Sequence, residues 1–187
     1  MSKAHKQSQR VALGGIVAAL CITVMFLSGV LPALYIVAPM VSGMLLLILA
    51  EEVSVPWAWL TYAAVSLLSL FVLFDKDAAL MFILFFGYYP ILRPKLQKIV
   101  PKALRIFVKV ILFNIFLVLD YLLTVYLLGL PTFEDMGRWA LVVMALVFNY
   151  VFIMYDVILS RMHWFYLRFF RSKIHPRRNQ KNPKNIK

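Results

Sequence analysis

Long apolar blocks alternate with short polar connections along most of this chain. Six blocks follow one another, at residues 11–30, 34–50, 54–74, 78–92, 106–128 and 139–160. A helix needs about 20 residues to cross about 30 Å of hydrocarbon. The first, third, fifth and sixth blocks reach that length, the second is slightly short and the fourth is the shortest. The pattern predicts an all-α integral membrane protein, built as a six-transmembrane-helix bundle.

The composition agrees with a membrane protein. Of 187 residues, 63% are hydrophobic and 15% are charged, and the mean hydropathy is +0.85. Soluble domains are nearer half apolar and a quarter charged. Six spans leave no room for a separate soluble domain. The first block is long for a signal peptide and no small-x-small cleavage site closes it, so we interpret it as an uncleaved span.

The distribution of Lys and Arg predicts the orientation. If the N-terminus is inside, six crossings place 18 of the 20 basic residues on the inner side and leave only Lys76 and Arg138 outside. Such asymmetry follows the positive-inside rule. We therefore expect a protein that crosses a bacterial cell membrane several times and has both termini on the inner side. The expected parts are a basic N-terminus at 1–10, the membrane domain at 11–160 and a basic tail at 161–187.

Two basic segments flank the last two blocks. Residues 93–109, RPKLQKIVPKALRIFVK, form an amphipathic stretch that we expect to lie on the inner leaflet before the fifth span. The tail sequence RSKIHPRRNQKNPKNIK, residues 171–187, is polar and carries two prolines, which predicts disorder and attraction to anionic lipid. RNA binding is the alternative for such a run. Because the tail lacks interleaved aromatics and any recognisable module, we expect no nucleic-acid partner.

One acid interrupts the fifth block, in the sequence NIFLVLDYLLTVY. At mid-depth an ionisable residue such as Asp120 is expected to face the bundle interior and to have a partner. Thr124 lies one helical turn further along, and Asn149 lies at matching depth in the antiparallel sixth block. Asn114 is matched in the same way with Asp156. These groups form either a structural clamp between two spans or the polar wall of a substrate or proton site.

Motifs for catalysis and for cofactor binding are missing from the sequence. The three histidines lie near the termini, and the patterns HExxH, CxxC, Walker A, GxSxG and GxGxxG do not occur. We therefore expect no enzyme, no metal and no cofactor. The aromatic stretch FFGYYP, with Gly87 and Pro90, predicts a kinked helix end.

Small residues form two stripes on the first block. Ala12, Gly15 and Ala19 make one stripe, and Gly14 and Ala18 make the other. Small residues four apart let a second helix approach closely, which favours association in lipid. Packing within the bundle and docking of another subunit both remain open.

A chain of under 200 residues, with six predicted spans, both termini inside and VALGGIVAAL in the first span, resembles the substrate-binding S component of energy-coupling-factor transporters. In that family an AxxxA pattern on the first span docks a transmembrane coupling subunit. Gly14–Ala18 and Gly15–Ala19 are the matching pairs, with glycine in place of the first alanine. The resemblance implies a vitamin or other micronutrient bound near the outer face by the later spans, including Asp120 and Asn149.

The leading hypothesis is therefore a membrane-embedded binding subunit for uptake of a small solute. The resemblance implies that a coupling membrane subunit and two cytoplasmic ATPases energise it. The alternative is a non-transporting assembly or scaffold protein, which recruits lipids or partners through its basic cytoplasmic face.

Overall fold

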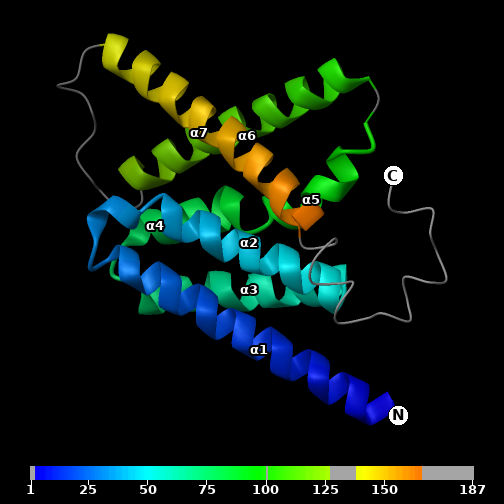
Figure 1. Ribbon diagram of the computed structural model, residues 1–187. Coiled ribbons are helices and arrows are strands. Elements are labelled where there is room, and N and C mark those ends of the chain that lie inside the picture. The colour runs from blue at the N-terminus through cyan, green and yellow to red at the C-terminus, as the bar shows by residue number, and fades with distance from the viewer. Residues whose placement is uncertain (1–2, 100, 127–137, 166–187) are drawn as a thin grey trace. The chain divides into compact units, whose positions relative to one another are not determined.

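The computed structural model describes residues 3–99, 101–126 and 138–165 of the chain. All regular elements in these ranges are helical (Figure 1). The chain divides into two compact units, residues 1–144 and 145–187, and each is described by itself. The elements are α1 (Lys3–Ser28), the 3₁₀ turn η1 (Pro32–Leu34), α2 (Val37–Glu52), α3 (Val55–Val72), α4 (Lys76–Met81), the π-helix η2 (Phe82–Phe86), α5 (Tyr89–Leu96), α6 (Lys102–Tyr126) and α7 (Arg138–Phe165).

Five helices of the described ranges are long and apolar enough to cross a membrane. They cover Gln7–Ser28, Val55–Val72, Lys76–Leu96, Lys102–Tyr126 and Val142–Met162. The sequence prediction of an all-helical protein with several membrane-spanning helices is confirmed at this level. The second apolar block contributes α2, which has only 16 residues because η1 and a turn take up its expected start. A helix of that length measures about 24 Å.

The core of the first unit lies between α1, α2, α3 and the α4–η2–α5 segment. Cys21 of α1 and Ser42 of α2 are fully buried and form a reciprocal clasp. The Cys21 thiol donates to the Ser42 carbonyl oxygen at 3.5 Å, and the Ser42 hydroxyl donates to the Cys21 carbonyl oxygen at 3.3 Å. Small polar side chains of this kind hold helices together in lipid without exposing a polar group.

Large apolar side chains cover the outside of the first unit. Leu60, Phe71 and Phe74 on and after α3 are 60%, 85% and 81% exposed, and α6 presents Ile106 and Phe107 in the same way. Soluble proteins rarely show contiguous apolar surface of this extent. Such a surface is compatible with contact to lipid, because hydrocarbon tails are as apolar as these side chains.

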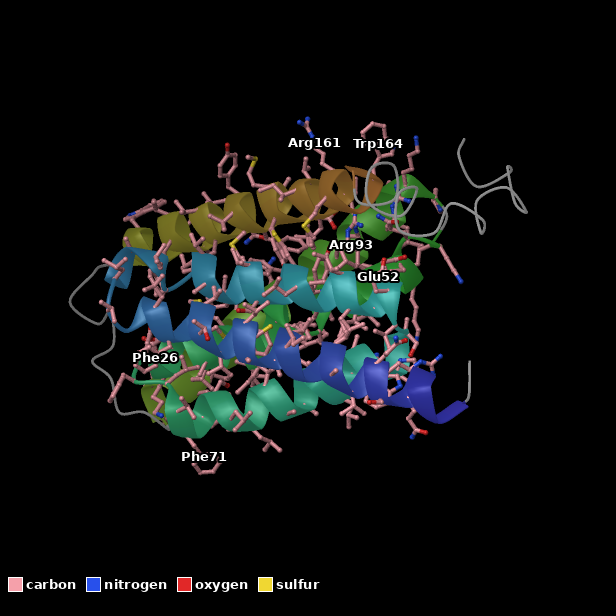
Figure 2. All side chains as sticks on the ribbon, turned by 60° about the horizontal axis from the view of Figure 1, so that its bottom comes forward. Phe26, Glu52, Phe71, Arg93, Arg161 and Trp164 are labelled. Atoms are coloured by element: carbon pink, nitrogen blue, oxygen red, sulfur yellow. The ribbon has the colours of Figure 1, made fainter. Side chains whose placement is uncertain are left out.

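The two ends of the first unit differ in charge. Arg93 and Glu52 lie at one end, and Phe26 and Phe71 lie at the other (Figure 2). Helix α1 begins at the end that carries Arg93, as Figure 1 shows for the N-terminus and the corner between α5 and α6. We call this end the basic end. Lys76 lies at the opposite end, at the start of α4.

A π-helix interrupts the fourth apolar block where the sequence predicts a kink. The Gly87 amide donates to the Phe82 carbonyl oxygen at 2.8 Å, five residues back, so the Ile83 carbonyl does not receive that bond. The Tyr62 hydroxyl of α3 donates to the Ile83 carbonyl oxygen at 2.6 Å instead. Pro90 follows and has no amide hydrogen, so a regular α-helix cannot continue through it unbroken. The observed form is thus a π-helix and a short turn between α4 and α5.

Candidate functional site

Carboxylates gather at the start of α4, at the end opposite the basic end. Asp75 caps the helix, because its Oδ1 accepts from the Ala78 amide at 3.1 Å. Asp77 lies in the first turn, where the helix dipole favours a negative charge. Lys76 between them points back to α3, and its ammonium donates to the carbonyl oxygens of Leu70 and Leu73 at 2.6 and 2.8 Å.

Helix α6 brings a second polar group to the same place. The Thr124 hydroxyl donates to Asp77 Oδ1 at 3.5 Å, which joins the last turns of α6 to the first turn of α4. Asp120 lies one turn before Thr124 on the same face of α6. The Asp77 carboxylate lies within electrostatic range of Asp120. The predicted pair of Asp120 and Thr124 therefore has a neighbour in α4 that the sequence analysis did not include.

Asp120 carries a polar atom without a partner. Its Oδ1 is buried and accepts no hydrogen bond from the described residues. A buried acceptor left unsatisfied costs about 1–3 kcal/mol, and more when it is charged. Such an atom needs an explanation, which water, a proton or a bound ligand supplies.

Tyr35 completes the cluster from the turn between η1 and α2. Burial raises the pKa of its phenol above the ordinary value, and three nearby carboxylates raise it further. These carboxylates belong to Asp77, Asp75 and Asp120. The phenol therefore stays protonated at neutral pH. We define the acidic cluster as Tyr35, Asp75, Asp77, Asp120 and Thr124.

The side-chain amides of Asn114 and Asn149, two of the predicted site residues, donate hydrogen bonds within their own helices. The Asn114 side-chain nitrogen donates to the Val110 carbonyl oxygen, and that of Asn149 donates to the Ala145 carbonyl oxygen, both at 2.8 Å. Asn149 belongs to the second unit, which is described by itself. The pairing of Asp120 with Asn149 therefore stays a prediction, as does that of Asn114 with Asp156.

The sequence pattern did not predict three members of the acidic cluster, which are Tyr35, Asp75 and Asp77. Asp75 and Asp77 stand in the connection FDKDA, which was assigned to a turn, and Tyr35 stands at the start of the second apolar block. Membrane depth could have suggested their proximity to Asp120. In the expected topology, the end of the fifth block and the start of the fourth lie on the same side of the membrane. Depth alone does not show which helices are neighbours.

The two small-residue stripes of α1 face different ways. Gly14 is buried, and a Cβ atom there would lie 3.2 Å from Thr61 Oγ1 of α3, so this stripe packs within the unit. Ala18 is half-buried against the core. Ala12, Gly15 and Ala19 are exposed, and a Cβ atom on Gly15 would have no neighbour within 4 Å.

No group of three or more His, Cys, Asp or Glu side chains in the described ranges is arranged to hold a metal ion. Comparison with protein-family models, with curated proteins and with solved structures gives no match.

Proposed function

We propose that this protein is a binding subunit for the uptake of a small solute across a bacterial cell membrane. The observation that carries the proposal is the buried, unsatisfied Oδ1 of Asp120 beside the contact between Asp77 and Thr124. Polar groups within membrane spans are costly and commonly mark solute or ion pathways. A cluster of carboxylates with a hydroxyl and a phenol suits a solute that carries N–H or cationic donor groups.

The proposed topology has six crossings with both termini inside. The basic end, which includes the start of α1, then faces the cytoplasm, as the positive-inside rule requires. The acidic cluster then lies near the outer face, where a solute arrives. Helix α2 is the short crossing, and local thinning of the bilayer at its ends accommodates it.

The exposed stripe of Ala12, Gly15 and Ala19 supports a partner in the membrane. A smooth surface on α1 allows close approach of a second helix. The resemblance to the S component of energy-coupling-factor transporters implies that this partner is a transmembrane coupling subunit, joined to two ATPases. We propose the same assembly here.

The test is co-purification of the solute with wild-type and variant proteins. Asp120→Asn keeps the shape of the side chain and removes its charge. We expect the amount of bound small molecule, measured by mass spectrometry after mild detergent extraction, to fall at least about tenfold, because a hydrogen bond to a charged group contributes about 1.5–3 kcal/mol. Glu52→Gln removes an acid at the basic end and should leave the bound amount unchanged.

Equal amounts of solute in Asp120→Asn and wild type would contradict the assignment of the site. The absence of any bound molecule and of any ATPase in the wild-type sample would contradict the function, and would favour the scaffold alternative.

A further inference from the structure

The backbone at the end of α5 and just after it, over residues 93–99, is hydrogen-bonded. The amides of Gln97, Lys98 and Ile99 donate to the carbonyl oxygens of Arg93, Lys95 and Leu96 at 2.9, 3.1 and 3.2 Å. The Arg105 guanidinium then reaches back from the first turns of α6 and donates to the Gln97 carbonyl oxygen at 3.2 Å. A wound turn and a side-chain brace therefore hold the end of α5 against the start of α6.

Three lysines stand exposed on this corner. Lys95, Lys98 and Lys102 are all exposed, whereas Arg93 and Lys109 of the same basic segment are only 3% and 6% exposed. The sequence contains no acid between Asp77 and Asp120, so no acidic neighbour along the chain neutralises the lysines. The start of α6 adds the partial positive charge of a helix N-terminus.

Apolar side chains lie directly beside these lysines. Leu104, Ile106 and Phe107, in the first turns of α6, are 47%, 59% and 62% exposed. The exposed apolar face continues along α6 through Ile111, Ile115 and Val118. The surface therefore passes from cationic to apolar within about one helical turn, which is the profile of a phospholipid from headgroup to acyl chain.

We propose that this corner is a binding site for an anionic phospholipid. The lysines hold the phosphate and the headgroup, and an acyl chain lies along the exposed face of α6. Charge complementarity selects an anionic over a zwitterionic lipid, because a lysine near an anionic membrane surface gains about fivefold in binding. The proposal is independent of the solute site, which lies at the opposite end of the first unit.

The experiment measures lipid selectivity at the protein surface. The full-length protein is placed in nanodiscs with spin-labelled phosphatidylglycerol or phosphatidylcholine, and the motionally restricted fraction of each label is compared. The test variant is Lys95→Gln, Lys98→Gln and Lys102→Gln. Two controls are Lys→Arg at the same three positions, which keeps the charge, and Arg177→Gln, Arg178→Gln and Lys181→Gln, which removes the same charge elsewhere.

We expect the wild-type protein to prefer phosphatidylglycerol. In the Gln variant at the corner, that preference should fall at least about fivefold, which is the effect expected from the loss of a single lysine. The Arg variant should keep the preference. An equal loss in the variant at 177–181 would overturn the proposal in favour of overall charge. Displacement of the labelled lipid by soluble glycerol phosphate would overturn it in favour of a free-phosphate site. An unchanged preference in the corner variant would overturn it outright.

Discussion

Single residues of this protein show which contacts can be predicted from a sequence pattern and which cannot. The unusual position of Asp120 in an apolar block was visible in the sequence, and the structure places Asp77 within electrostatic range of it. Thr124 could be predicted because a helix sets the spacing of one turn. Asp77 and Tyr35 could not, because their contacts depend on which helices are neighbours. The same holds for Cys21 and Ser42, whose clasp joins residues 21 positions apart.

Cys21 offers a direct measurement of core integrity, because it is the sole cysteine and is fully buried. We expect a maleimide reagent to leave it unmodified in the folded protein and to modify it on denaturation. Ser42→Leu overfills the site between α1 and α2 and should cost about 1–3 kcal/mol, which increases the rate of labelling. Ser42→Ala removes one hydrogen bond and should cost only about 0.6 kcal/mol. Rapid labelling of the wild type would show that the clasp is not formed.

Some apolar blocks of the sequence correspond to single long helices, and others do not. The long blocks at 11–30, 54–74 and 106–128 each correspond to one long helix, because apolar length alone decides whether a span can form. The block at 78–92 does not, since Gly87 and Pro90 convert its middle into a π-helix and a turn. The basic stretch 93–109 is divided between the end of α5, a corner and the start of α6. Hydrophobicity carries no information about these changes of backbone form.

Alanine substitutions at three glycines test helix packing, because the space for an added Cβ atom differs among them. At Gly87 a Cβ atom would lie 2.7 Å from the Tyr62 ring, so Gly87→Ala should destabilise the protein by about 1–3 kcal/mol. Gly15→Ala meets open space and should be neutral or stabilising by up to about 1 kcal/mol, because alanine favours helix. Gly14→Ala, with its contact at 3.2 Å, should fall between them. Thermal unfolding in detergent gives the order, and a Gly87→Ala protein as stable as Gly15→Ala would contradict the packing of η2 against α3.

On the scale of the whole molecule, the charge pattern is the strongest prediction. Within the first unit the basic residues concentrate at one end and the acidic cluster lies at the other, as the sequence arrangement of Lys and Arg suggests. Apolar length does not fix the number of crossings, because the second apolar block produces α2, a helix of only 16 residues.

Single-cysteine labelling tests the proposed topology in intact cells. In a Cys21→Ala background, a cysteine at Phe74 should react with a membrane-impermeant maleimide from outside, because this exposed side chain lies at the end opposite the basic end. A cysteine at Lys98 should react only after the membrane is opened. The reverse pattern would place the basic end outside and would contradict the N-in orientation.

The wide turn at Phe82–Phe86 has a consequence for the length of any related sequence that lacks it. A π turn is equivalent to an α turn with one residue inserted, so its removal would shorten this segment by one residue. A relative that lacks the insertion should therefore align with this sequence through a one-residue gap between positions 82 and 87. That relative would also have no need for a tyrosine at the position of Tyr62, since its Ile83 counterpart would already be bonded within the helix.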